Sequence, residues 1–236
     1  MAKKVFVGVG HGGADPGAVA NGFKEKDLNL PIALACRDEL QRHGVSVLMS
    51  RTKDEDETLS GKIKMANDFG ADLALDIHNN AGGGDGAEVY HTYLGGKGKT
   101  LAKNILAEIV KLGQYNRGAK VLKNSRGVDG YLFIRNTTMP AVIVECAFLD
   151  NKNDITIIDT PAEQKAMGIA IAKGVLQTLG IAYIEPAAAP AATTSKLYRV
   201  QVGAYKVKTN ATNMQKKLKA AGFDAIIVEV DAPAKG

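Results

Sequence analysis

The sequence predicts an α/β protein with a mostly parallel sheet that helices flank on both faces, followed by a small C-terminal βαβ unit. Short apolar runs rich in β-branched residues alternate with segments of helical periodicity through residues 1–183. This alternation is typical of parallel sheets whose connecting helices cover both faces. A segment rich in Pro, Ala and Thr, residues 184–196, has no apolar periodicity and indicates a linker to residues 197–236.

The expected elements follow in chain order. Residues 5–9 form a short β-branched run, which predicts the first strand. In the next segment apolar side chains recur at helical spacing, and a glycine stands where helices commonly stop. These residues are Ile32, Cys36, Leu40 and Gly44. The later strands are expected at residues 45–49, 73–77, 87–93 and 141–148, and the later helices at residues 59–66, 101–112 and 162–179.

The composition is that of an ordinary globular protein. Hydrophobic residues make up 45% and charged residues 23% of the 236 residues. No stretch approaches the roughly 20 consecutive apolar residues of a membrane-spanning helix, so no membrane span is expected. The N-terminal apolar run is shorter than the roughly 7–15 residues of a secretory signal. We therefore expect synthesis in the cytoplasm without a signal peptide.

The net charge of +5 is concentrated at the C-terminal end. From Lys196 onward the chain carries eight Lys or Arg and three Asp or Glu residues, which is the whole excess, so the first 195 residues are neutral. A basic segment favours an anionic partner such as wall polymer or nucleic acid. Solvated lysines that serve solubility explain the same pattern equally well.

The segment GVGHGG, residues 8–13, matches the G-x-G-x-x-G fingerprint of dinucleotide-binding proteins. That fingerprint requires a helix to begin at once, so that the helix N-terminus holds the pyrophosphate. Here the next helix is expected only near Asp27, after a loop with Pro and further Gly residues. This context argues against a dinucleotide site.

Two histidines and a glutamate stand at the ends of expected elements. His11 follows the first strand, Glu25 precedes the next helix, and His78 ends the third strand. Because sites in such sheets form where strands end, these side chains can converge at one edge. Two imidazoles and a carboxylate form one of the known catalytic zinc sets, with a fourth position for water. Their spacing is long and irregular, so a surface or hydrogen-bonded role for each histidine stays open.

Glu145 is the polar residue within the apolar run 141–148. Burying a carboxylate in such a strand is unfavourable by on the order of several kcal/mol unless the group is paired, protonated or near a metal. Glu145 therefore either pairs with a buried arginine, stays protonated, or lies beside a metal ion.

Three segments carry a resemblance to a known family. VFVGVGHGGADPGAVANGFKEKDLNL, ADLALDIHNNA and YLFIRNTTMPAVIVECAFLDNKND resemble, in this order, three signature regions of the zinc-dependent N-acetylmuramoyl-L-alanine amidases (Amidase_3 type). This family occurs in bacterial autolysins and phage endolysins, and the resemblance covers about residues 3–181. It implies that Zn²⁺ is the cofactor and that His11, Glu25 and His78 bind it. It also implies that Glu145 is the catalytic carboxylate.

The same resemblance implies that Asn80 and Arg135 contact the substrate, because both lie in the matching segments. One residue departs from the family pattern. Asp76 stands where a small hydroxyl residue is common before the metal-binding histidine. Asp76 is either too far from the ion to matter or part of the shell around its ligands.

The resemblance implies a peptidoglycan hydrolase and not a nucleic-acid-binding protein. The expected reaction is hydrolysis of the amide between N-acetylmuramic acid and the L-alanine of the stem peptide, with Glu145 as general base and then general acid. Such an enzyme acts on the cell wall after release, as a phage endolysin through a holin or as an autolysin when a sporulating mother cell lyses. Two alternatives are a non-catalytic wall-binding protein on an amidase fold, and a zinc peptidase or deacetylase acting on a different amide.

Residues 197–236 resemble one strand–helix–strand repeat of the sporulation-related (SPOR) domain, which binds peptidoglycan. Tyr198, Val200 and Val202 alternate, Met214, Leu218 and Ala221 share a helical face that Gly222 ends, and Ile226, Val228 and Val230 alternate again. SPOR domains usually contain two such halves, and one half of about 40 residues rarely buries a sufficient core alone. We therefore hypothesise that a homodimer completes the domain. A truncated sequence and a basic tail that only tethers the enzyme are the alternatives.

Overall fold

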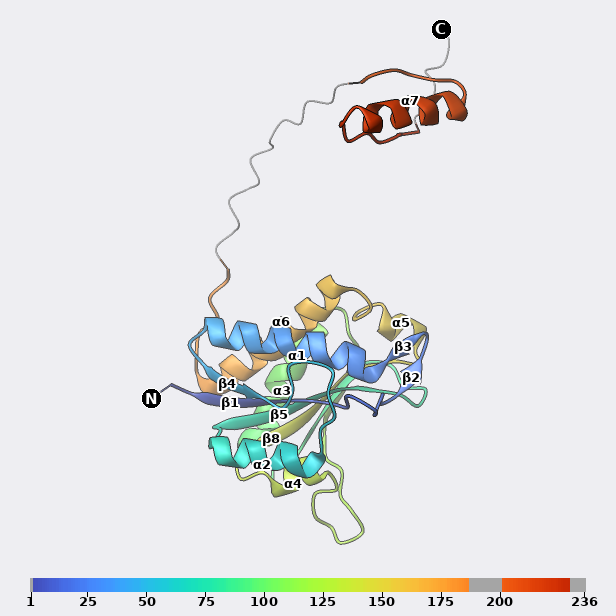
Figure 1. Ribbon diagram of the computed structural model, residues 1–236. Coiled ribbons are helices and arrows are strands. Elements are labelled where there is room, and N and C mark those ends of the chain that lie inside the picture. Colours follow the sequence, from blue (N-terminus) through green and yellow to red (C-terminus); the bar gives the residue numbers. More distant parts are fainter. Residues whose placement is uncertain (1, 187–200, 230–236) are drawn as a thin grey trace. The chain divides into compact units, whose positions relative to one another are not determined.

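The structure of the protein, a computed structural model, describes residues 2–186 and 201–229 (Figure 1). The chain divides into two units, Met1–Glu185 and Pro186–Gly236. All the candidate catalytic and metal-binding residues belong to the first unit.

A six-stranded sheet forms the centre of the first unit, with the strand order β4-β1-β5-β8-β6-β7. Its strands are β1 (Lys4–Val9), β4 (Ser46–Met49), β5 (Leu73–Asn80), β6 (Ala87–His91), β7 (Asn116–Lys120) and β8 (Ala141–Phe148). Neighbouring strands run parallel except β6 and β8, which are antiparallel. The mostly parallel sheet predicted from the sequence is therefore confirmed. Before the first helix, β2 (Val19–Ala20) and β3 (Phe23–Lys24) form a separate antiparallel pair.

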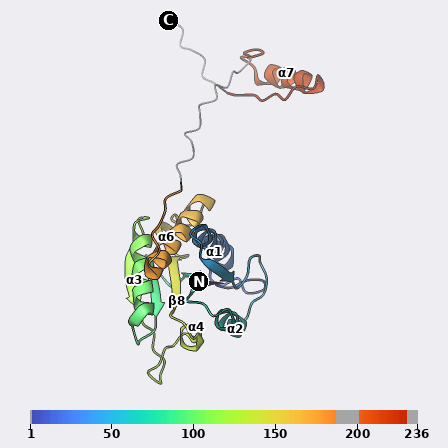
Figure 2. The ribbon, with the colours of Figure 1, turned by 90° about the vertical axis from the view of Figure 1, so that its left-hand side faces the viewer.

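Helices cover both faces of the sheet, as the alternation predicts (Figure 1). One core cluster joins the sheet to α1 (Glu25–Arg42), α3 (Gly96–Val110) and α6 (Pro161–Leu179). A smaller cluster on the opposite face involves α2 (Leu59–Phe69) and α4 (Leu132–Asn136). Helices α1 and α6 lie side by side in both views (Figures 1 and 2), and the short α5 (Lys152–Ile155) follows β8.

Strand alternation decides which side chains can form a site. In β5, Leu75 and Ile77 enter the core beneath α1, α3 and α6. Because successive side chains of a strand point to opposite faces, Asp76 and His78 point to the face of α2 and α4. Glu145 of β8 is paired in register with His78, so it points to the same face.

Some elements differ from the sequence pattern. The strand β7 has polar or small residues without apolar alternation, and it lies at the edge of the sheet. Charged side chains are common on such edges because they discourage pairing with other chains. The strand β5 continues through His78 to Asn80, and α1 begins at Glu25 itself.

In the second unit the described residues contain one regular element, α7 (Lys208–Ala220), and none of its residues is buried. The expected helix is confirmed, and Gly222 follows it with a φ of 85°. The described residues on either side of α7 do not form the expected strands. A strand requires the backbone of a second strand to pair with, and none is supplied within residues 201–229. Tyr198, Val200 and Val230 lie outside the described residues.

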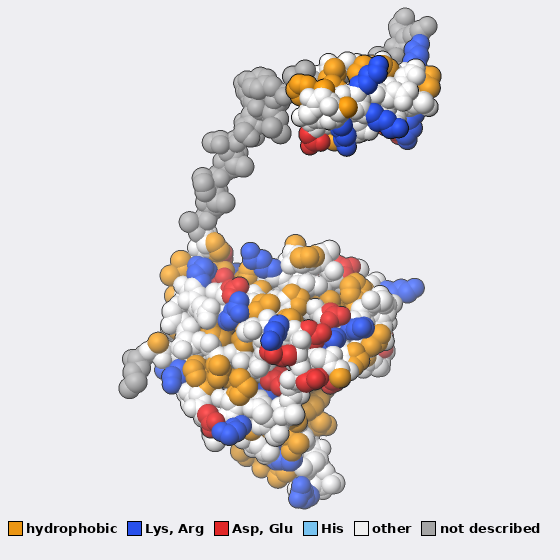
Figure 3. All heavy atoms as spheres, viewed as in Figure 1, with side chains coloured by type: hydrophobic (Ala, Val, Ile, Leu, Met, Phe, Trp, Pro, Cys, Tyr) orange, Lys and Arg blue, Asp and Glu red, His pale blue; other side chains and the backbone are white. Residues whose placement is uncertain are grey.

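The surface of the two units differs in character. In the view of Figure 3, acidic and basic side chains are interspersed over the first unit, whereas the unit with α7 shows mainly basic and hydrophobic side chains and few acidic ones. This agrees with the location of the excess positive charge from Lys196 onward. Among the described residues, no helix combines the length and the apolar character needed to cross a bilayer.

Candidate active site

The candidate metal-binding side chains lie at the ends of three elements. His11 closely follows β1, Glu25 is the first residue of α1, and His78 lies near the end of β5. The backbone of His11 has a φ of 58°, in the left-handed region that residues other than glycine rarely adopt. Backbone conformations of this kind are concentrated at functional sites, where the surrounding structure maintains them.

The Glu25 carboxylate bridges the two imidazoles. Its Oε2 atom lies 3.0 Å from His11 Nε2, and its Oε1 atom lies 3.0 Å from His78 Nδ1. The ring centroids are 5.0 Å apart with an interplanar angle of 84°. One ligand atom from each of the three residues lies within 4.8 Å of the other two. Two imidazole nitrogens and a carboxylate oxygen fit a catalytic zinc ion, which takes three protein ligands and keeps a fourth position open.

The glycines around His11 are required by the crowding of this cluster. A Cβ at Gly10 would lie 2.4 Å from His78 Cε1, and a Cβ at Gly17 would lie 2.6 Å from both Glu25 Oε2 and His11 Cδ2. Only glycine permits such a close approach of backbone to side chain. The glycine-rich segment therefore serves the packing of the candidate ligands, in agreement with the argument against a dinucleotide site.

Each imidazole turns its second nitrogen to another carboxylate. His11 Nδ1 lies 2.7 Å from Asp15 Oδ2, and His78 Nε2 lies 3.4 Å from Asp76 Oδ2. Asp15 is exposed and Asp76 is buried. The residue that departs from the family pattern is thus close to a candidate metal ligand.

The electrostatics of the three candidate ligands favour a cation. Burial opposes the charge on Glu25, but hydrogen bonds from both histidines outweigh it and hold the pKa of Glu25 well below its usual range. Burial also acts to lower the pKa of His78, yet the Asp76 and Glu25 carboxylates raise it to about 10. The hydrogen bond to Glu25 raises the pKa of His11 as well. The raised pKa of His78 means that a metal ion has to compete with a proton for this imidazole when it binds.

Glu145 lies beside this cluster on β8, paired in register with His78 on β5 and with Glu88 on β6. Burial raises the pKa of its carboxyl to about 7. Its Oε2 atom is buried and has no hydrogen-bond partner among the described residues. A carboxylate with this pKa and a vacant acceptor atom can take up and return a proton near neutral pH.

A pocket of about 330 Å³ lies over these side chains. Its lining residues are His11, Asp15, Glu57, Thr58, Leu59, Lys62, Asp76, His78, Tyr131, Leu132, Phe133, Ile143 and Glu145. Nothing in the sequence motifs identifies Glu57, Lys62 or Tyr131 as site residues. For Lys62 a signal was present, because it shares a helical face with the apolar Leu59 and Ala66 and interrupts an otherwise hydrophobic stripe.

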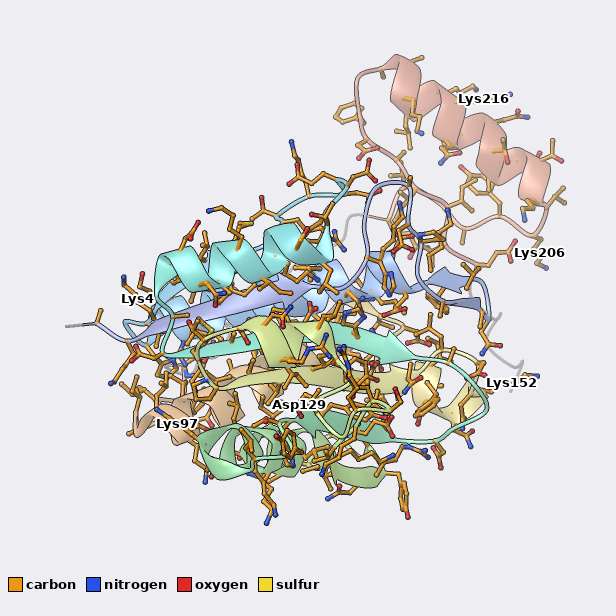
Figure 4. All side chains as sticks on the ribbon, turned by 90° about the horizontal axis from the view of Figure 1, so that it is seen from below. Lys4, Lys97, Asp129, Lys152, Lys206 and Lys216 are labelled. Atoms are coloured by element: carbon orange, nitrogen blue, oxygen red, sulfur yellow. The ribbon has the colours of Figure 1, made fainter. Side chains whose placement is uncertain are left out.

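The structure puts Asn80 and Arg135 outside the lining of this pocket. Asn80 Nδ2 donates a hydrogen bond of 3.0 Å to Glu88 Oε1. Arg135 Nη1 donates a hydrogen bond of 2.9 Å to the backbone oxygen of Asp129, which is labelled in Figure 4. A contact of Asn80 or Arg135 with the substrate stays a prediction.

Comparison with known proteins gives two family matches. The family described as N-acetylmuramoyl-L-alanine amidase matches residues 5–177, and the SPOR domain family matches residues 169–229. A sporulation-specific N-acetylmuramoyl-L-alanine amidase of Bacillus subtilis (strain 168) is 36% identical over 232 residues, which cover 97% of this chain and 85% of that protein. An endolysin of Bacillus phage SPP1 is 34% identical, covering 77% of this chain and 68% of its own length. The structure of the amidase AmiC2 of Nostoc punctiforme superposes with a TM-score of 0.69 at 29% identity and covers 75% of this chain and 97% of that one.

Proposed function

The chain belongs to the N-acetylmuramoyl-L-alanine amidase family, and from this premise we propose that a Zn²⁺ ion held by His11, Glu25 and His78 is its cofactor. The protein is a peptidoglycan hydrolase that cleaves the amide between N-acetylmuramic acid and the L-alanine of the stem peptide. The observation that carries the zinc proposal is the convergence of two imidazoles on one carboxylate, beside a buried carboxyl with a vacant oxygen.

We propose different roles for the two glutamates because their surroundings differ. Glu25, whose pKa is held low, stays ionised as a ligand. Glu145, whose pKa is about 7, accepts the proton of the attacking water at neutral pH. The water oxygen bonds to the carbonyl carbon of the lactyl group, the bond from that carbon to the L-alanine nitrogen breaks, and Glu145 returns the proton to this nitrogen. When bound, zinc polarises the carbonyl and lowers the pKa of its water to roughly 7.

Metal analysis tests the cofactor. We expect close to one zinc ion per chain in the wild-type protein after incubation with zinc and removal of the excess. The His11→Ala variant should hold far less, because it loses one of three ligands. The His43→Ala variant is the matched control, since His43 stacks on Tyr183 and belongs to no candidate ligand group. A wild-type protein without zinc, or equal zinc in both variants, would contradict the assignment.

For the domain organisation we propose a catalytic domain at residues 1–183, a linker at 184–196 and a SPOR-like wall-binding repeat at 197–236. The SPOR family match begins at residue 169, inside α6. Yet Ile171 and Val175 of α6 are buried in the core cluster of the first unit. This packing supports a boundary after α6. Limited proteolysis should therefore cut the chain between residues 184 and 196 and leave α6 with the catalytic fragment.

We further propose that the C-terminal units of two chains associate. Large hydrophobic side chains on both sides of α7 are exposed: Val202 58%, Tyr205 41%, Val207 55%, Phe223 64%, Ile226 78% and Val228 49%. Burial against a second copy would remove this surface from water and supply the missing partner strands. Sedimentation velocity should give a dimer for the wild type and a monomer for Phe223→Asp. A wild-type monomer at all concentrations would contradict the association.

The biological setting that we propose is autolysis of the mother cell during sporulation. The match to the sporulation-specific amidase covers 97% of this chain, whereas the match to the phage endolysin covers 77%. The first match thus extends into the C-terminal unit. A reporter driven by the gene's own promoter should be switched on late in sporulation, and induction together with prophage genes would favour the endolysin instead.

A further inference from the structure

Each of the two candidate ligand histidines lies beside an aspartate, and one of these aspartates is exposed to solvent while the other is buried. Each presents one nitrogen to Glu25 and the other nitrogen to an aspartate. The Asp15 side chain, beside His11, is 66% exposed, whereas the Asp76 side chain, beside His78, is 3% exposed. Water therefore competes more with the contact of Asp15 than with the contact of Asp76.

The Asp76 carboxylate is fixed from several sides. Lys62 Nζ donates to both of its oxygens, at 2.8 and 3.0 Å, and also to the backbone oxygen of Val9 at 3.2 Å. Glu57 Oε2 lies 3.7 Å from the same ammonium group. A Cβ at Gly8, the register partner of Asp76 on β1, would lie 2.5 Å from Asp76 Oδ1 and 3.1 Å from Lys62 Cδ. The carboxylate thus occupies space that only a glycine at position 8 leaves open.

Stability alone does not account for this arrangement. Replacing a buried ion pair with apolar residues of similar size is often neutral or stabilising, because the desolvation of both charges is unfavourable. A carboxylate that accepts the second ring proton of a ligating histidine, in contrast, fixes the tautomer and orientation of that ring. Function at the metal site therefore explains the pair better than folding does.

We infer that Asp76, held by Lys62, is a positioning residue that keeps the proton of His78 on Nε2 and so directs the Nδ1 lone pair to the metal. The inference rests on the zinc site proposed above. Asp15 acts in the same way on His11 through Nδ1, with a weaker effect because it is exposed to water.

The substitution Asp76→Asn tests this with little change in size. Lys62 has only donors, so it holds the amide oxygen and leaves the amide NH₂ facing His78 Nε2. An NH₂ at that position favours the wrong tautomer, with the proton on Nδ1. We expect the dissociation constant for zinc, measured by competition with a chromophoric chelator, to rise about 10–100-fold. Asp15→Asn should raise it less.

The matched control is Asp154→Asn. Asp154 is a carboxylate of similar burial that accepts hydrogen bonds from the backbone NH groups of Gly86 and Phe148 and contacts no imidazole. Its substitution should lower the melting temperature of the metal-free protein and leave zinc affinity near the wild-type value. The double variant Asp76→Ala/Lys62→Leu removes both buried charges, so the fold should be retained while zinc affinity stays low.

The outcomes separate the two claims. Zinc affinity within about threefold of wild type in Asp76→Asn or in the double variant would overturn the positioning role and leave the zinc site standing. An equal loss of affinity in Asp154→Asn would also overturn it, because the effect would then reflect general destabilisation. Failure of the wild-type protein to bind zinc would overturn both claims together.

Discussion

Helices α6 and α7 show how differently the two units use similar sequence patterns. Helix α6 has eight buried residues, among them Ile171 and Val175, and belongs to the large core of the first unit. Helix α7 has none, and Ile226 beyond it is 78% exposed. A periodic pattern thus predicts that an element exists, but burial requires enough apolar surface nearby. The first unit supplies that surface itself, whereas the described residues of the second unit do not.

The largest expected effect concerns catalysis, because all the candidate catalytic residues lie in the first unit. Glu145→Gln should lower kcat on a soluble muropeptide about 10²–10⁴-fold, because the variant lacks the group that accepts the proton of water. Ile226→Asp in the second unit should leave this kcat unchanged. The rate at which primary amine is released gives kcat for both variants. An equal loss of kcat in the two variants would contradict the assignment of catalysis to the first unit.

The next effect concerns stability. Ile32 is fully buried, so Ile32→Ala should lower the free energy of unfolding of the first unit by about 2–5 kcal/mol through the cavity it leaves. Ile226→Ala should change it by less than about 0.5 kcal/mol at low protein concentration. Urea titration followed by circular dichroism measures both values. If the C-terminal units associate, Ile226→Ala should instead destabilise the second unit, by an amount that grows with protein concentration.

The smallest effect is a pH dependence within the first unit. Burial raises the pKa of Glu145 from an ordinary 4.5 to about 7, so folding favours its protonated form. This contribution to stability is complete below pH 4.5 and is lost as the pH rises through about 7. A glutamine side chain cannot ionise, so the Glu145→Gln variant in chelator should gain about 1–3 kcal/mol over the wild type between pH 5 and pH 8. If the difference in the free energy of unfolding between variant and wild type does not change with pH, burial does not raise the pKa of Glu145.

The sequence predicts those features that depend on local pattern. The strands around His11 and His78 and the helix after Glu25 follow from apolar periodicity, and the strand–helix alternation predicts the parallel sheet. The sequence predicts that this helix begins near Asp27, whereas in the structure it begins at Glu25. The convergence of these three residues is less accessible, since 53 positions separate Glu25 from His78 and only the strand order brings them together. The resemblance to the amidases, and not spacing, selected them as ligands.

Features that depend on contacts across the fold were not predictable in this way. The contact of Lys62 with Asp76 joins a helix to a strand, and neither residue alone indicates it. The edge strand β7 lacks apolar alternation because one of its sides has no neighbour. In the second unit the expected strands do not form, for the opposite reason. The apolar alternation is present there, but the described residues supply no second strand to pair with.

The most direct test of the account is digestion of purified peptidoglycan, with mass spectrometry of the products. Wild type and Glu145→Gln would be compared with and without EDTA, followed by restoration with zinc. We predict stem peptides with a free N-terminal L-alanine from the wild type alone, lost on chelation and regained with zinc. A different new amine, such as one within the peptide or on the sugar, would contradict the amide assignment. Intact wall with the protein still bound would instead contradict catalysis.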